Sequence, residues 1–348
     1  MSFFRRNRNL LISLFVFCLL YSTVAANRTV TADADGAIQI KVMHLSMFEI
    51  GANTGDFPGE FQFYYDEFFK DGATAYNVKG APNPFFVNAK GVAGTVTGMG
   101  KARSGATLMA ILLDPRFDFS KTYFITTGCS GVAPDTGTIG DVFICDWVVD
   151  FDLGHAWRAA DDPGSSKLYR LGAGYADNGS IKLNKELADW AYGIVKDIKL
   201  EDSDEAINYR KNYPQAIANE KPKVRGGFTS VTGDNYWHGA TASLEAKAKC
   251  NEYGASPYGV TQMEDNAFAV VLRSLGYLDR YIIVRDTVNF DQPYPGQSVV
   301  QSLDASSGAF YIGRVNNHRV GSALIHELLK RDFSTWTLPG CQAVVASK

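Results

Sequence analysis

The sequence offers little that would suit a nucleic-acid duplex as a partner. Its 348 residues include 34 Lys and Arg and 37 Asp and Glu, so the formal net charge is only −3. Neither sign of charge is gathered into a long block, and a basic stripe that could follow phosphate backbones is missing. We therefore expect no nucleic-acid duplex and no anionic membrane surface among the partners.

Long apolar runs are also scarce. One such run covers residues 10–20, whereas a bilayer span needs roughly 20 apolar residues. Arginines precede this run, and the small-residue site Val24-Ala25-Ala26 follows it, which is the layout of a secretory signal peptide over residues 1–26. A signal anchor is the alternative. We expect a mature protein that is soluble and secreted or extracellular, periplasmic in a bacterial source, without indicated membrane association after cleavage.

Cysteine is rare, and Cys18 lies in the expected signal peptide. Four cysteines remain in the mature chain: Cys129, Cys145, Cys250 and Cys341. An even number in an oxidising compartment predicts one or two structural disulfides, with the pairing left open. Neither these cysteines nor the five histidines have the spacing of metal ligands, so we expect no metal. The sequons at Asn27 and Asn178 would accept glycans in a eukaryotic source.

The remaining chain has ample material for one large domain, because 46% of its residues are hydrophobic and 13% aromatic. Strand-like patterns and helical patterns alternate without repeats, which predicts an α/β fold. The strand-like segments are residues 38–48, 92–97, 123–127, 142–149 and 282–289, and the helical ones are 107–113, 183–198, 240–249, 266–275 and 318–331. We expect a short N-terminal segment over residues 27–37 and one domain over 38–340, with 201–223 as an insertion, an active-site flap or an inert surface loop.

Glycines mark two places where the backbone can approach a ligand. Gly98 and Gly100 precede a helical pattern, so their amides are predicted to face an anion at a helix start, with Arg103 adding positive charge. The segment Gly128-Cys129-Ser130-Gly131 follows an apolar strand pattern and is predicted to form a turn.

Polar groups gather in two segments further along the chain. Glu264 opens an apolar segment of helical spacing, and the strand pattern at 282–289 ends with Arg285, Asp286 and Asn289. Open α/β folds bind ligands at the carboxyl ends of their strands. Together the two segments predict a site for a small polar ligand.

The order of these motifs resembles the purine nucleoside permease family, within the nucleoside phosphorylase and nucleosidase superfamily. The resemblance covers roughly residues 38–329 and rests on six motifs: Thr97-Gly98-Met99-Gly100-Lys101, Gly128-Cys129-Ser130-Gly131, Ile139-Gly140-Asp141, Thr232-Gly233-Asp234-Asn235-Tyr236-Trp237, Gln262-Met263-Glu264 and Val284-Arg285-Asp286. It implies a single domain with a central mixed sheet flanked by helices. It also implies binding of a purine nucleoside and cleavage of its N-glycosidic bond by a hydrolase or a phosphorylase. A nucleoside-binding component that supports transmembrane transport, and a storage-type protein, are the alternatives.

The resemblance also implies roles for the sugar and base contacts. Glu264 would hold the ribose 2′ and 3′ hydroxyls, which tighten as the sugar approaches an oxocarbenium-like state, with Met263 packed beneath. Tyr236 and Trp237 are candidates to stack on the base, and Asp234 shares their motif as a substrate contact. The competing interpretations are a helix-dipole acid for Glu264 and core packing for the aromatic residues.

Asn289 falls where many nucleosidases carry an Asp that protonates the purine. An amide can instead bridge the N7 and O6 edge of a 6-oxopurine, so inosine or guanosine would be preferred over adenosine. In the competing assignment Asp286 or Asp291 is the acid.

Arg285 would bind phosphate or orient an attacking water, and a structural salt bridge is the alternative. Phosphorylases often place an Arg in the first loop, whereas the charged residues among 56–60 of this chain, Asp56 and Glu60, are both acidic. Glu60 is therefore a candidate to activate water. We expect no cofactor, with inorganic phosphate as the one candidate co-substrate. A homo-oligomer is compatible with the resemblance, because related phosphorylases share residues across subunits.

Overall fold

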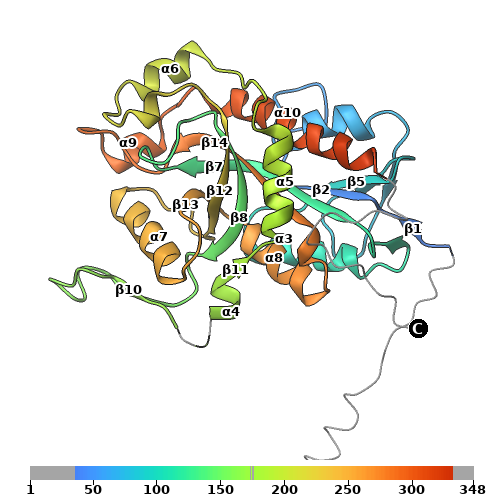
Figure 1. The fold of residues 1–348 in the computed structure, drawn as a ribbon, viewed down its shortest axis with the longest axis horizontal. Coiled ribbons are helices and arrows are strands. Elements are labelled where there is room, and N and C mark those ends of the chain that lie inside the picture. The colour runs from blue at the N-terminus through green and yellow to red at the C-terminus, as the bar shows by residue number, and fades with distance from the viewer. Residues whose placement is uncertain (1–35, 173, 175, 332–348) are drawn as a thin grey trace, which may run out of the picture. The chain divides into compact units, whose positions relative to one another are not determined.

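The fold is described by a computed structural model that covers residues 36–172, 174 and 176–331 (Figure 1). The expected signal peptide, the sequon at Asn27 and Cys341 lie outside these residues.

Ten strands form one mixed sheet. They are β2 (Val42–Ser46), β3 (Thr74–Tyr76), β4 (Phe85–Val87), β5 (Val92–Val96), β7 (Tyr123–Val132), β8 (Val142–Asp150), β11 (Ser180–Lys182), β12 (Val224–Thr232), β13 (Tyr258–Gln262) and β14 (Tyr281–Phe290). Two further pairs stand apart from this sheet: β1 (Ile38–Gln39) with β6 (Phe117–Asp118), and β9 (His155–Ala156) with β10 (Tyr169–Arg170). This arrangement confirms the predicted α/β class and central mixed sheet.

Part of the sheet closes on itself. Strand β14 pairs in parallel with β7 on one side and antiparallel with β8 on the other. Since β8, β12, β13 and β7 also pair in that order, five strands complete a ring, from which β2, β5, β4 and β3 extend. The ring places β7 between β13 and β14, so that residues 128–131 of β7 and Gln262 of β13, from the sequence motifs, come near Arg285, Asp286 and Asn289 of β14.

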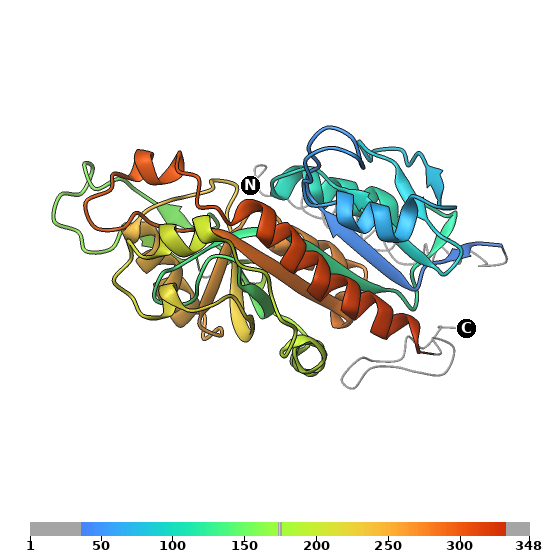
Figure 2. The ribbon, with the colours of Figure 1, turned by 90° about the horizontal axis from the view of Figure 1, so that it is seen from above.

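Helices cover both faces of the sheet (Figures 1 and 2). Helix α10 lies along β14 (Figure 2). It also contacts α5, and α3 packs against α8. The α-helices are α2 (Gln62–Tyr64), α3 (Lys101–Leu112), α4 (Ala176–Gly179), α5 (Lys185–Val195), α6 (Asp204–Arg210), α7 (Ala240–Glu252), α8 (Asp265–Ser274), α9 (Val299–Leu303) and α10 (Phe310–Leu329). The described residues also contain a π-helical turn, η1 (Tyr65–Phe69), and the 3₁₀ turns η3 (Ile217–Asn219) and η4 (Leu278–Arg280).

Strand β14 supplies apolar side chains to the core on both faces. Successive side chains of a strand point to opposite faces, so Tyr281 and Ile283 join one hydrophobic cluster while Ile282 and Val284 join the other. Val320 and Leu324 of α10 are buried in the second cluster. A strand that is buried on both faces has no polar alternation, which explains its continuous apolar run.

The expected turn at residues 128–131 is wrong, because β7 continues as a strand to Val132. The glycines are required by close packing rather than by a turn. A Cβ on Gly128 would lie 2.2 Å from Met47 Cε and 2.7 Å from Glu60 Oε1, closer than real Cβ contacts. Gly128 therefore lets functional side chains approach the strand.

Helix α10 begins at Phe310, well before the expected start at His318. Its first turns bury polar residues, Arg314, Asn316 and Asn317, which interrupt the apolar periodicity. The segment 201–223 contains α6 and η3, and its Tyr213 and Ala218 belong to the hydrophobic core.

Cys129, Cys145 and Cys250 are all free thiols, so the expectation of a disulfide that includes any of them is wrong. Cys145 on β8 and Cys250 in α7 are buried in separate apolar clusters. Burial raises the pKa of both thiols, which makes them inert packing residues.

Candidate active site

The centre of the site is the carboxylate of Glu264, which is only 3% exposed. Glu264 is the N-cap residue of α8, but its side chain does not cap that helix. Its Oε1 accepts a hydrogen bond from the backbone N–H of Gly100 at 3.0 Å, and its Oε2 lies 3.3 Å from Arg285 Nη2. Burial raises the pKa of Glu264 to about 7, while Arg285 opposes this shift and the nearby Glu60 carboxylate adds to it.

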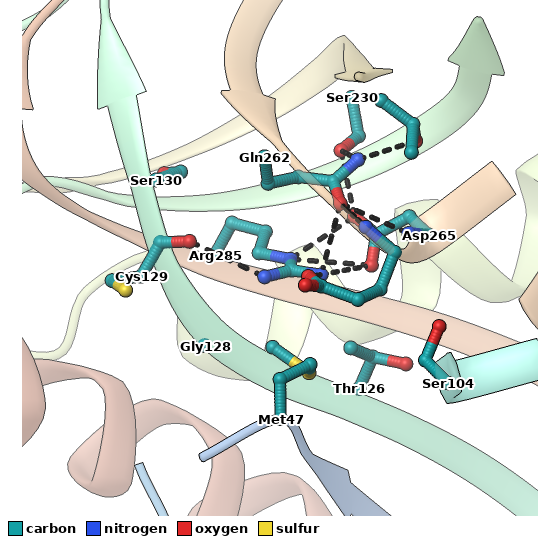
Figure 3. Close-up of polar contacts among 12 residues, drawn as sticks. Met47, Ser104, Thr126, Gly128, Cys129, Ser130, Ser230, Gln262, Asp265 and Arg285 are labelled. Carbon is teal, nitrogen blue, oxygen red and sulfur yellow. Dashed lines mark hydrogen bonds and ion pairs between the residues drawn. The ribbon is translucent and has the colours of Figure 1, made fainter. Parts of the chain in front are cut away.

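Arg285 lies in β14 and is almost wholly enclosed by protein groups (Figure 3). Its guanidinium donates to Asp265 Oδ1 at 2.6 Å, to Gln262 Oε1 at 3.1 Å and to the carbonyl of Cys129 at 3.2 Å. The structure thus brings Arg285 next to Glu264 but commits most of its donors to internal partners. This arrangement suits a residue that orients the Glu264 carboxylate and stabilises its negative charge.

Glu60 supplies a second buried carboxylate. Its Oε2 accepts from the backbone N–H of Met47 at 2.8 Å, and its Oε1 accepts from the backbone N–H of Cys129 at 2.9 Å. Arg314 Nη1 lies 4.0 Å away. These bonds fix Glu60 against the carboxyl-terminal half of β7, where the missing side chain of Gly128 leaves room for it.

Three backbone amides of the glycine loop at the start of α3 are bound to protein groups. The N–H of Gly98 donates to the Met47 carbonyl at 3.1 Å, that of Gly100 donates to Glu264, and that of Lys101 donates to Asp234 Oδ1 at 2.6 Å. Two carboxylates therefore occupy the helix start at which the sequence predicts an anion. Their negative charges match the positive end of the α3 dipole.

Tyr236 and Asn289 form a hydrogen-bonded pair in the wall of a cavity of about 410 Å³. The Tyr236 hydroxyl donates to Asn289 Oδ1 at 2.8 Å, and Asn289 Nδ2 donates to the Phe290 carbonyl at 2.8 Å. Gly131 makes this pair possible, because a Cβ there would lie 3.0 Å from the Tyr236 hydroxyl.

A second cavity, of about 470 Å³, borders the glycine loop. Its lining combines Gly98 and Arg103 with the apolar side chains of Met47, Phe61 and Val96. The predicted anion residues Gly98 and Arg103 thus line a different cavity from the pair formed by Tyr236 and Asn289.

Other predicted site residues lie in the interior. Trp237 is 5% exposed and stacks on Phe151 with ring centroids 5.1 Å apart. Asp286 is fully buried, forms an ion pair with Arg314 and accepts from Asn317 Nδ2 at 2.8 Å. Both residues are thus held by protein neighbours.

Asp291 and Met263 differ in their surroundings. Asp291 Oδ2 accepts from Ser243 at 2.8 Å and from Tyr258 at 2.9 Å, and burial raises the pKa of Asp291 to about 6. Met263 is half-buried immediately before Glu264. Of the two, only Met263 keeps part of its surface open beside the central carboxylate.

Sequence reasoning missed the residues that hold the charged centre together. Asp265 binds Arg285, and Arg314 neutralises Asp286. The position of Asp265 beside Glu264 was an available signal for the first pair. Arg314 comes from a helix whose pattern shows no sign of an internal charge, so the second pair had none.

Two features are absent from the part of the chain that the structure describes. The part of the chain that the structure covers contains no cluster of three or more His, Cys, Asp or Glu side chains arranged to hold a metal ion. Among the helices of residues 36–331 that the structure describes, none is long and apolar enough to cross a membrane.

The fold is that of the nucleoside phosphorylase and nucleosidase class. A 5′-methylthioadenosine/S-adenosylhomocysteine nucleosidase from Neisseria meningitidis superimposes with a TM-score of 0.51 and 13% identity, over 82% of this chain and 99% of the other. The futalosine hydrolase of Helicobacter pylori gives a TM-score of 0.52 and 15% identity, over 83% and 98%. Identities this low establish the fold alone.

The family is settled by sequence. Residues 39–338 match the family model described as purine nucleoside permease (NUP), and the chain belongs to that family. A probable purine nucleoside permease of Schizosaccharomyces pombe is 27% identical, over 92% of this chain and 100% of that protein. The purine nucleoside permease of Candida albicans is 26% identical, over 67% and 63%.

Proposed function

We propose that the protein binds purine nucleosides and cleaves their N-glycosidic bond, with water as the acceptor of the ribose. The observation that carries this proposal is the buried Glu264 carboxylate, held between the Gly100 amide and Arg285 beside a second carboxylate, Glu60. The nucleosidase fold of the chain supports it.

The chemistry follows from the charge that develops on the sugar. Breaking the bond makes the ribose oxocarbenium-like, so an acceptor of its hydroxyl protons is worth more in the transition state than in the ground state. Glu264 is this acceptor. Arg285 keeps the carboxylate oriented and favours its charged form, since its Nη2 lies 3.3 Å from Glu264. Glu60 is the candidate base for the attacking water.

Water is preferred to phosphate because of the groups around the glycine loop. A phosphate near Gly100 and Lys101 would displace or face the carboxylates of Glu264 and Asp234, which already bind these amides. Arg285 is committed to Asp265. Arg103 lines the cavity of about 470 Å³. If inorganic phosphate were a co-substrate, Arg103 is the cation that would bind it.

A second candidate is a nucleoside-binding component without turnover that supports nucleoside transport. The permease names of the S. pombe and C. albicans relatives favour it. In either case we propose a location outside the cytosol, because the N-terminus resembles a signal peptide. Asn178 of the second sequon is exposed, and we propose it as a site for a glycan. Amino-terminal sequencing of protein recovered from its natural source tests the cleavage site after Ala26.

The test of function is chromatography of the products formed from inosine, guanosine, adenosine and uridine, each with and without phosphate. Free ribose and base without phosphate are expected. Ribose 1-phosphate formed only with phosphate would overturn the choice of water. Nucleoside binding with no base released under either condition would favour the transport component.

A further inference from the structure

The neighbours of Tyr236 determine whether its hydroxyl can donate or accept a hydrogen bond in the cavity. A carbonyl oxygen can only accept, so the Phe290 carbonyl requires the Asn289 amide nitrogen, 2.8 Å away, to face it. The amide oxygen of Asn289 must then face Tyr236, also at 2.8 Å. Because this oxygen can only accept, the Tyr236 hydroxyl has to donate its single proton to it.

A hydroxyl that has given away its proton presents only lone pairs to the cavity. Burial raises the pKa of Tyr236, so the phenol keeps its proton at neutral pH and the bond to Asn289 persists. Asn289 Nδ2 carries two hydrogens, and one of them is used by Phe290. The pair in the cavity wall therefore offers one acceptor, at Tyr236, and one donor, at Asn289.

This pattern matches one class of purine. The edge of a 6-aminopurine presents an acceptor at N7 and a donor at the 6-amino group, whereas a 6-oxopurine presents acceptors at both positions. We propose that Tyr236 and Asn289 select 6-aminopurine nucleosides such as adenosine, with Tyr236 accepting from the 6-amino group and Asn289 donating to N7. This proposal rests on the proposed nucleoside function and reverses the preference for inosine or guanosine expected from the sequence.

The selectivity for 6-aminopurines follows from the fixed acceptor role of Tyr236 and donor role of Asn289. A 6-oxo group would bring its lone pairs against those of Tyr236, and rotating the phenol proton toward the ligand would leave Asn289 Oδ1 without its donor. Gly131 holds the pair in this arrangement, because the backbone lies close enough that an added Cβ would meet both side chains, at 3.0 Å and 3.3 Å.

The wild-type protein tests the proposal without any variant. Binding of adenosine, inosine and purine riboside, which has no 6-substituent, is measured by stopped-flow protein fluorescence, before any base is released. We expect adenosine to bind at least tenfold more tightly than inosine, with purine riboside between them. Equal affinity for all three, or a preference for inosine, would overturn the proposed selectivity and leave the nucleoside function intact. Failure of all three to bind would instead refute the proposed function, and the selectivity with it.

The variant Tyr236→Phe assigns the effect to the hydroxyl. Adenosine affinity should fall about tenfold to the level of purine riboside, while inosine should be unchanged or improved. Tyr294→Phe is the matched control, because the Tyr294 ring packs against Tyr209 and Tyr213 and does not line the cavity. A uniform loss for all three ligands in Tyr236→Phe would show a stacking or structural role and would contradict the proposal.

Discussion

The carboxylate of Glu264 accepts a hydrogen bond from the backbone N–H of Gly100 across 164 residues of chain. The two residues occupy the N-cap positions of helices α8 and α3 respectively. The positive ends of both helix dipoles therefore lie near one carboxylate and favour its charge, while burial opposes it. Burial raises the pKa of Glu264 to about 7 against the opposing Arg285 charge and Gly100 hydrogen bond, so the charge of Glu264 responds to pH in the neutral range.

Replacing Glu264 with Gln should abolish turnover while the fold survives. The amide keeps the shape and can still accept from Gly100, but it loses the charge that stabilises an oxocarbenium-like sugar. We expect base release to fall at least about a hundredfold, as removal of one stabilising group in an active site typically does. Glu186→Gln, in the exposed first turn of α5, is the matched control. Base release at the wild-type rate in the Glu264 variant would exclude this residue from the reaction.

Nucleoside affinity should rise with pH in the neutral range. Only the charged form of Glu264 accepts from two ribose hydroxyls, and its pKa of about 7 predicts a gain of about tenfold between pH 6 and pH 8. Calorimetric titration at several pH values measures this slope. The slope should vanish in Glu264→Gln, and an unchanged slope in that variant would assign the titration to another group.

Stability should change with pH in the opposite direction. The pKa of Glu264 is raised from its ordinary 4.5, so the folded state binds this proton more strongly than the unfolded chain does. The resulting contribution to the free energy of unfolding is fully present below pH 4.5 and is lost as the pH rises through about 7. Urea unfolding of the wild type and Glu264→Gln at pH 5 and pH 8 isolates it. A difference between the two proteins that does not change with pH would contradict the assignment.

Gly100→Ala should destabilise the protein by about 1–3 kcal/mol, the usual cost of a backbone conformation that only glycine adopts freely. Gly100 has φ 82° and ψ 156°, and an added Cβ would lie 3.1 Å from Asp234 Oδ1. Gly105→Ala, within α3, is the control, because its Cβ would make ordinary contacts with Ala267 at 3.5 Å and Val271 at 3.9 Å, and alanine favours helix. Denaturant unfolding of both variants makes the comparison, and equal stabilities would show that the Gly100 backbone is not strained by a side chain.

Asp286→Asn should cost about 3–5 kcal/mol of stability, because it removes the carboxylate that pairs closely with buried Arg314 and leaves only Glu60, at 4.0 Å. Asp189→Asn removes an exposed ion pair with Lys185 and should cost less than about 1 kcal/mol. Chemical denaturation measures both losses. A fully stable Asp286→Asn protein that releases no base would instead return Asp286 to the catalytic role that the sequence had suggested.

Local patterns in the sequence were enough to predict the helices and strands that are buried mainly by apolar side chains. The apolar stretch at residues 282–289 predicted β14, and the helical spacing from Asn266 predicted α8, because strands and helices buried by apolar side chains carry their period in the sequence. The motif order was enough for the family, which the match over residues 39–338 confirms.

Packing between distant segments decided the features that the sequence did not predict. Gly128 and Gly131 suggested a turn, yet they lie within β7, since Glu60 and Tyr236 come from elsewhere to fill the space above them. The first turns of α10 escaped detection because Arg314 and Asn317 are buried against Asp286, a partner on a strand many residues away.

The sequence by itself determined which residue types this protein could bring to a nucleoside: a carboxylate, an arginine, an amide and an aromatic hydroxyl. Only the tertiary structure decided what each one has left to offer. Arg285 is committed to Asp265, the amides of Gly100 and Lys101 are committed to Glu264 and Asp234, and Tyr236 donates its proton to Asn289. The physical reason is that a hydrogen-bonding group used internally is no longer available to a ligand, and partners distant in the chain are set by folding.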